Sequence, residues 1–334
     1  MGITMDDLAA LANVSQGAVS LVLNGKAKGQ ISRQKQELIL RLAREHKYRV
    51  NMAARVLRKQ RQYAVGVIMP ANLNPFYASM ATLLQSLLMK RGYMPLFAFI
   101  SPGFGIGQIY NFLYERNVDG IISWETAPEM SNDDIPMVLF GEKSQKRSIG
   151  FPETKRVCRC GFDYTESYTK LYTKLYADGH RRIGFLGMEG DSRYLLLKKF
   201  LGTRRVPGRD KWFFPHQDRI VENNDFFDAI FDMPNRPTAL ITTNDETARQ
   251  LISAGFRRGI RFPQDISVTG FMNLPYTKSM FPPLTTVDSC SDRLAEVMVS
   301  SMLKLIEQPD IPAEDTFIRT KLVIRDSCGP VPKD

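Results

Sequence analysis

Residues 4–24 read TMDDLAALANVSQGAVSLVLN, and their spacing decides how the chain begins to fold. Thr4, or Asp6 in its place, can cap a first helix. The dipeptide at 13–14 breaks that helix, and Ser15 can cap a second short one. The apolar side chains recur at helical spacing: Met5, Leu8, Ala9, Ala12, Val19, Val22 and Leu23. Two short helices joined by so tight a turn predict a helix-turn-helix, whose second helix can enter the major groove of DNA.

A third helix and a concentration of positive charge complete the head. Ser32 can cap a helix that runs to about residue 46, and a basic loop at 26–30 precedes it. The first 61 residues hold 12 Lys or Arg and 4 Asp or Glu, so they carry +8 of the chain's formal net charge of +10. A generic helical domain for protein contact is the alternative, but this charge distribution favours duplex DNA as the partner.

From Tyr63 onward, apolar runs of strand length alternate with amphipathic stretches of helical length. We expect strands at 64–69, 94–100, 120–124, 136–140, 182–187, 238–242, 266–270 and 316–324. We expect helices at 75–91, 107–116, 166–177, 245–255 and 291–307, and assign no element to 143–160. Such alternation indicates crossover units and parallel sheets. Because one sheet cannot easily hold so many units, two α/β lobes are expected.

Short motifs follow one another in a fixed order over nearly the whole chain. They are TxxDLA from Thr4, ANVSxxAVS from Ala12, YxxNxxAxxL from Tyr48, NPFY from Asn74, VDGII from Val118, GHRRI from Gly179, RPTA from Arg236, PxDISV from Pro263 and PLTTVD from Pro283. In this order the chain resembles the lactose/galactose repressor (LacI/GalR) family. The resemblance implies an all-α helix-turn-helix head and an α/β two-lobed body like that of periplasmic binding proteins, with parallel sheets.

The resemblance also implies a domain order and a function. A DNA-binding head would occupy 1–47, and a hinge helix with its linker 48–62. The N-terminal lobe of the ligand-binding and dimerisation core would take 63–160 with 289–317, and the C-terminal lobe 161–288 with 318–334. Such a protein is a cytoplasmic, homodimeric transcriptional regulator, in most cases a repressor. A small ligand between the lobes changes its affinity for a pseudo-palindromic operator, through its differential affinity for two states.

Carried over position by position, the resemblance implies three groups of contacts with double-stranded DNA. The major groove would meet Ser15, Gln16, Gly17, Ser20 and Leu21, and the DNA backbone would meet Thr4, Asn24, Lys26 and Arg33. The minor groove would meet the hinge residues Asn51, Ala54, Leu57 and Arg58. Gln16 can pair with adenine and Leu21 can touch a thymine methyl. Leu57 would be the wedge that kinks the duplex, with a core leucine as the alternative, and Val50 stands where the family usually has proline.

The resemblance likewise implies an effector site in the cleft between the lobes. Its residues would be Asn74, Phe76, Tyr77 and Trp124 from one side, and Asp163, Arg193, Asn244 and Asn273 from the other. Packing within the lobe is the alternative for the aromatic residues, and capping of the next helix is the alternative for Asn244. Gly141 and Met272 stand where sugar-binding members often have acidic residues, and the stretch at 191–199 lacks the usual Arg-x-x-Gly-Phe helix. A neutral sugar in the usual pose is therefore disfavoured, and the expected effector is a sugar derivative or an anionic metabolite near Arg193 or Lys143.

The sequence offers little for catalysis, metals or cofactors. The glycines at 103, 105 and 107 miss the dinucleotide fingerprint, and neither a Walker A loop nor an H-E-x-x-H motif occurs. The four cysteines make no disulfide framework, and no apolar run reaches the roughly 18 residues that span a bilayer. We expect no enzyme, no cofactor, no metal and no membrane partner. Two alternatives stay open: a small-molecule enzyme with a DNA-binding head, and a regulator whose degenerate cleft is switched by a partner protein.

Overall fold

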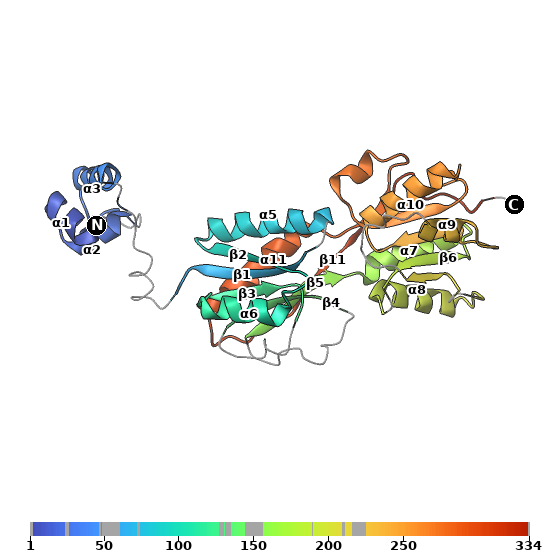
Figure 1. Cartoon of the computed structure of the whole chain (residues 1–334), viewed down its shortest axis with the longest axis horizontal. Helices are drawn as coiled ribbons and strands as arrows, with labels where there is room; N and C mark the ends of the chain where they lie inside the picture. The colour runs from blue at the N-terminus through green and yellow to red at the C-terminus, as the bar shows by residue number, and fades with distance from the viewer. Residues whose placement is uncertain are drawn as a thin grey trace. The chain divides into compact units, whose positions relative to one another are not determined.

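The chain divides into two compact units, Met1–Gln62 and Tyr63–Asp334 (Figure 1). The computed structural model describes residues 3–23, 27–46, 48, 61–71, 74–126, 130, 135–143, 156–188, 190–208, 211–215 and 225–332. Each unit has its own hydrophobic core, which in the first is built around Leu8, Val19 and Ile39. Among the described residues, no helix is both long enough and apolar enough to cross a membrane.

The head, as we call the first unit, contains α1 (Met5–Ala12), α2 (Gln16–Leu23) and α3 (Arg33–Glu45). Thr4 rather than Asp6 caps α1. Its hydroxyl accepts the N–H of Asp7 at 3.2 Å, while the Asp7 carboxylate accepts the N–H of Thr4 at 2.8 Å. Asn13 then ends α1 in the left-handed conformation, with φ at 49°.

Local hydrogen bonds also fix the turn that presents α2. The Ser15 hydroxyl accepts the N–H of Ala18 at 3.2 Å, and the Ser32 hydroxyl accepts the N–H of Lys35 at 3.5 Å. The ammonium of Lys35 donates to the carbonyl oxygens of Ala12 and Asn13, at 3.3 and 2.9 Å. The third helix is thereby joined to the turn between the first two, and the predicted helix-turn-helix is confirmed.

The second unit, which we call the body, contains two six-stranded sheets. The first sheet is parallel and has the order β11-β5-β4-β3-β1-β2. Its strands are β1 (Ala64–Pro70), β2 (Met94–Ile100), β3 (Gly120–Ser123), β4 (Met137–Glu142), β5 (Val157–Asp163) and β11 (Thr316–Arg319). Helices α5 (Pro75–Lys90) and α11 (Ser291–Glu307) pack together on one face, and α6 (Ile106–Glu115) covers the other (Figure 1).

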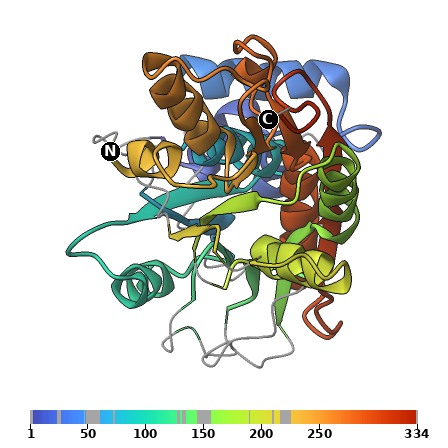
Figure 2. The same cartoon turned by 90° about the vertical axis from the view of Figure 1, so that its right-hand side faces the viewer.

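The second sheet has the order β12-β10-β9-β8-β6-β7, and β12 is antiparallel to its neighbour β10. Its strands are β6 (Ile183–Gly187), β7 (Phe213–Pro215), β8 (Ala239–Thr242), β9 (Ser267–Met272), β10 (Thr285–Asp288) and β12 (Lys321–Val323). The helices are α7 (Thr165–Ala177), α8 (Ser192–Thr203), α9 (Asp225–Phe231) and α10 (Asp245–Arg257), with a 3-10 turn η2 at Pro275–Lys278. In Figure 2, α7 and α8 lie on one side of this sheet, and α9 and α10 on the other. We call the two sheets with their helices the first and second lobes.

The chain passes between the lobes after β5, after β10 and between β11 and β12. The segment expected as one strand at 316–324 is therefore two strands, one in each sheet, with buried Thr320 between them. The Thr320 hydroxyl lies 2.5 Å from that of Ser167, and its N–H donates to the carbonyl of Asp163 at 3.3 Å. Two of the three crossings are thus hydrogen-bonded to each other.

The structure also differs from the expected boundaries. The limits at 160 and 317 fall inside β5 and β11, because Cys160–Asp163 pairs in register with Thr316–Arg319 in the first sheet. Among the described residues, six elements were not expected: β5, α8, β7, α9, η2 and β10. The stretch at 191–199, which lacks the family's helix motif, nevertheless forms the start of α8, with Asp191 as its cap.

Candidate functional site

The five positions expected to read the major groove line one concave surface on the head. This surface encloses about 540 Å³ over α2, and its residues are Ser15, Gln16, Gly17, Ala18, Ser20, Leu21, Gln30 and Ile31. Ser15 and Gly17 are exposed, while Gln16, Ser20 and Leu21 are half-buried. Small side chains on this face leave the helix backbone accessible, as close approach to base edges requires.

The expected DNA-backbone positions are only partly described. Thr4 is at the capped start of α1, and Arg33 is at the start of α3, with 93% of its side chain exposed. The Arg33 guanidinium pairs with the Glu37 carboxylate at 3.2 Å. Because this ion pair is exposed and weak, a DNA phosphate could take the place of Glu37. The remaining positions lie outside the described residues: Asn24, Lys26, Asn51, Ala54, Leu57 and Arg58.

Four of the expected effector residues follow the carboxyl ends of β1 and β3. Asn74 is buried and caps α5, accepting the N–H of Phe76 at 3.0 Å. Phe76 is also buried, and its ring meets the half-buried ring of Tyr77 edge-on. Trp124 stacks on Phe140 with centroids 5.7 Å apart, and its buried indole N–H finds no acceptor among the described residues.

Three further expected residues are engaged within the protein. Asp163 was expected in the second lobe, but it ends β5 in the first, whereas Asn244 and Asn273 lie in the second. The Asp163 carboxylate pairs with Lys143 at 2.8 Å, which holds its pKa below the usual range although burial acts in the opposite direction. Asn244 is buried and caps α10, accepting the N–H of Thr247 at 2.8 Å. Asn273 donates to Asp288 and accepts from Arg325, at 3.1 and 2.7 Å. In the structure, Asn74 and Asn244 both act as helix caps.

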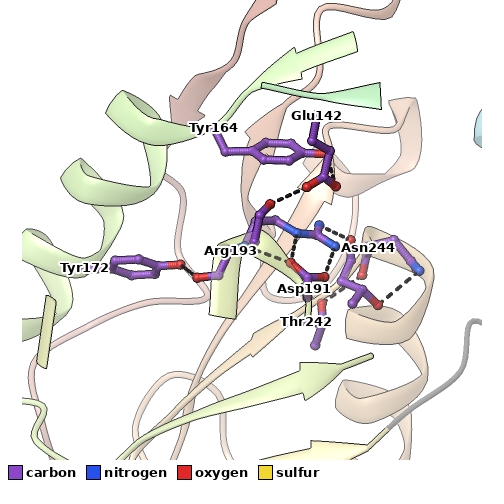
Figure 3. A network of polar contacts seen from close by, with 9 residues as sticks. Glu142, Tyr164, Tyr172, Asp191, Arg193, Thr242 and Asn244 are labelled. Carbon is purple, nitrogen blue, oxygen red and sulfur yellow. Dashed lines mark hydrogen bonds and ion pairs between the residues drawn. The ribbon is translucent and has the colours of Figure 1, made fainter. Parts of the chain in front are cut away.

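Arg193 is the most completely engaged of the expected residues. Its guanidinium donates to both carboxylate oxygens of Asp191, at 2.9 and 2.6 Å, and to the carbonyl of Thr243 at 2.7 Å. Its guanidinium carbon lies 5.5 Å from the ring centroid of Tyr164 and 5.1 Å from that of Phe271. The cation near which an anionic effector was expected is thus buried and already paired (Figure 3).

Sequence reasoning missed the acidic residue of this region. Glu142 is the last residue of β4, one position after Gly141, where an acid was sought and not found. The Tyr164 hydroxyl donates to its carboxylate at 3.1 Å, and the Ser192 hydroxyl donates to the other oxygen. Burial raises the pKa of Glu142, although Arg193 acts in the opposite direction. Glu142 is visible in the sequence, but only the structure shows that its carboxylate meets Ser192 of the second lobe.

A second buried carboxylate, Asp245 at the start of α10, makes stability depend on pH. It accepts from the Thr286 hydroxyl at 2.5 Å and the N–H of Leu274 at 2.8 Å, and burial raises the pKa of Asp245 to about 7. As pH rises, the unfolded state loses this proton first, so the native state is destabilised from about pH 4 up to about pH 7 and no further. We expect the free energy of unfolding to fall by about 1 kcal/mol per pH unit in that window.

Asp245→Asn should remove the contribution of this residue and make the slope shallower, because the amide does not titrate in this range. The measurement is urea unfolding between pH 5 and 8, followed by the fluorescence of Trp124 and Trp212, which both lie in the body. Asp265→Asn is the matched control, since Arg261 holds the pKa of Asp265 below its usual range and it does not titrate there. Equal slopes for the wild type and Asp245→Asn would contradict the assignment.

Comparisons with known proteins agree with both halves of the structure. Residues 4–51 match the family model of bacterial regulatory proteins of the lacI family. Residues 172–328 match that of the periplasmic binding protein-like domain. The NTD biosynthesis operon regulator NtdR of Bacillus subtilis is 26% identical over 344 residues, covering 97% of this chain and 99% of the relative.

Solved structures share the fold over the same length. The lac repressor dimer bound to operator and the anti-inducer ONPF matches with a TM-score of 0.77 at 19% identity, over 98% of this chain and 99% of the other. The transcriptional regulator CelR in complex with cellobiose matches with a TM-score of 0.64 at 21% identity, over 97% and 99%. The helix-turn-helix head therefore matches the lacI family of bacterial regulatory proteins, and the two-lobed α/β body matches the periplasmic binding protein-like domain.

Proposed function

We propose that this protein is a sequence-specific DNA-binding repressor whose operator affinity is set by a small effector bound in the body. The observation that supports this most directly is the concave surface over α2, on which all five expected major-groove residues meet. The positive charge of the first 61 residues supplies the attraction to phosphate. In this proposal 48–62 is the hinge, and the protein works in the cytoplasm.

We further propose that the protein is a homodimer, joined through exposed apolar side chains on both lobes. In the first lobe these are Met89 on α5, Met94 and Phe99 on the edge strand β2, and Phe112 on α6, each more than half exposed. In the second lobe the exposed rings of Phe256 and Phe281 stack with centroids 6.3 Å apart. Large apolar side chains exposed beside an open sheet edge are typical of a surface that a partner covers. A second copy of the chain would also supply the second head that a pseudo-palindromic operator needs.

For the effector, the charges favour an uncharged molecule over an anion. Both cations near which an anion was expected are paired, Arg193 with Asp191 and Lys143 with Asp163. The carboxylate of Glu142, at the end of β4, accepts hydrogen bonds from hydroxyl groups. Ligand hydroxyl groups therefore suit this region better than carboxylates or phosphates. In this proposal a sugar ring would pack against the stacked pair of Trp124 and Phe140. A sugar derivative is therefore the proposed class, in keeping with the cellobiose bound by CelR.

Genome-wide mapping of bound DNA, followed by titration of the strongest site, tests the proposed function. We expect tight binding to a pseudo-palindromic site and weak binding to a scrambled duplex of the same length. Calorimetry with neutral sugars, amino sugars, sugar acids and sugar phosphates then tests the effector class. Equal affinity for the site and the scrambled duplex would refute sequence-specific recognition, and binding of anionic ligands alone would refute the proposed class.

A further inference from the structure

The first turn of α3 carries two cations that are placed differently. Arg33 begins the helix with 93% of its side chain exposed, whereas Lys35 is half-buried. The ammonium of Lys35 donates to the carbonyl of Ala12 at 3.3 Å and to that of Asn13 at 2.9 Å. Although the two residues are close in the chain, the Arg33 side chain lies in solvent, and the Lys35 side chain binds the backbone of the head.

The carbonyls that Lys35 binds lie at the end of α1, where a cation is favourable. The last carbonyl oxygens of a helix have no partner within it, and the helix dipole places partial negative charge there. The sequence of α1, MDDLAALA, contains no basic residue. Lys35 supplies the charge from another helix, and it does so at Asn13, whose left-handed conformation turns the chain towards α2.

The next residue of α3 binds the chain on the other side of α2. The side-chain amide of Gln36 donates to the carbonyl of Ile31 at 2.7 Å and to that of Ala27 at 3.4 Å. Both carbonyls belong to the segment that follows α2, and Ile31 lines the concave surface. One turn of α3 therefore holds the backbone before α2 through Lys35 and the backbone after it through Gln36.

We propose that Lys35 and Gln36 form a clamp that sets the angle at which α2 enters the major groove. The clamp rests on the proposed function of the head, and it adds which residues make the reading of bases accurate. Both are positioning residues, because they act through the backbone on either side of α2. Groups that recognise a ligand must be held within about 0.5 Å and 10–20° of their productive geometry, so a small turn of α2 loses a contact with a base.

Lys35→Met tests the clamp in the full-length protein, because it removes the ammonium and keeps an unbranched side chain. The affinity for the operator should fall roughly tenfold, the value of one contact with a base, and the affinity for a scrambled duplex should change little. The slope of log affinity against log salt should stay that of the wild type, because Lys35 neutralises no phosphate. Lys35→Arg, which keeps a cationic donor, should restore operator binding.

Gln36→Met makes the corresponding test without any change of charge. It removes the amide that binds Ile31 and should reproduce the loss that is confined to the operator. Gln34→Met is its matched control, since Gln34 is exposed on the same turn of α3. Lys28→Met is the control for Lys35→Met: it removes the same charge from an exposed position in the preceding loop, and it should weaken binding to both duplexes alike.

Hydrogen exchange of the full-length proteins without DNA, followed by mass spectrometry, tests the clamp independently of DNA binding. In Lys35→Met, peptides that cover the turn at 9–15 should exchange roughly tenfold faster, the value of a hydrogen bond to a charged group. The protection of α3 should stay that of the wild type, because its own hydrogen bonds are not touched.

The clamp is refuted if both Lys35→Met and Gln36→Met leave the affinity for the operator unchanged. It is also refuted if Lys35→Met weakens both duplexes alike and lowers the salt slope by about 1, as loss of a phosphate contact would. Faster exchange throughout the head would show that these residues only stabilise its fold. If the wild type bound both duplexes equally, the proposed function would fail, while the exchange rates would still decide whether Lys35 holds the turn.

Discussion

Replacing Gln16 by alanine should lower the affinity for the operator by roughly tenfold to a hundredfold, the value of one bidentate contact with a base. Gln16 begins α2, and of the two amide side chains on the concave surface, Gln16 and Gln30, it is the one on the helix that would enter the major groove. The loss should be confined to the operator, and the affinity for a scrambled duplex should hardly change. Titration of both duplexes by fluorescence anisotropy measures the two affinities.

Two control variants separate base reading from other effects. Gln34→Ala makes the same change at an exposed position of α3 that is not part of the concave surface, and it should leave both affinities unchanged. Arg33→Ala should weaken binding to both duplexes alike and reduce the slope of log affinity against log salt by about 1. If Gln16→Ala weakened both duplexes equally, Gln16 would contact phosphate rather than a base.

Removing the carboxylate of Asp191 should destabilise the body by about 3–5 kcal/mol, because it leaves the buried guanidinium of Arg193 without its counter-charge. The side chains of the pair are only 9% and 8% exposed, so solvent cannot replace the lost interaction. Asp191→Ala also removes the cap of α8, whereas Asp191→Asn keeps a capping group and removes only the charge. Urea unfolding followed by tryptophan fluorescence measures both variants, and most of the loss should already appear with asparagine.

An exposed ion pair is the appropriate comparison for this variant. Glu166 pairs with Lys170 at 2.6 Å, but its side chain is 56% exposed, so Glu166→Ala should leave the stability almost unchanged. A loss of similar size for Asp191→Asn and Glu166→Ala would show that the Arg193 charge finds another partner. It would then return Arg193 to consideration as an effector ligand.

The head could be predicted from the sequence because its signals are local. Thr4, Ser15 and Ser32 each cap a helix within three residues along the chain, and Asn13 ends α1 by its own conformation. The strand β5 could not be predicted, because Arg159 breaks its apolar run. The compensating charge is Asp315, which pairs with Arg159 at 2.8 Å from 156 positions away.

The residues around Arg193 show the same limit for function. The sequence places Arg193 near the ligand, but it does not reveal that Asp191, two residues earlier, neutralises it. It shows Gly141 where an acid was sought, but only the fold brings the next residue, Glu142, to Ser192. The sequence shows which residues carry charges and hydroxyl groups. It does not show that Glu142 pairs with Ser192, because this depends on how β4 packs against α8.

The segment that crosses between the sheets at Thr320 also bears on synthesis of the protein. Each sheet takes one of its two outermost strands from this segment, β11 in the first and β12 in the second. A nascent chain that has released only its first 300 residues therefore lacks a strand in both lobes. Because these two strands are separated by one residue, the two sheets should be completed almost together once this segment has been synthesised, and the two lobes should unfold as one cooperative unit.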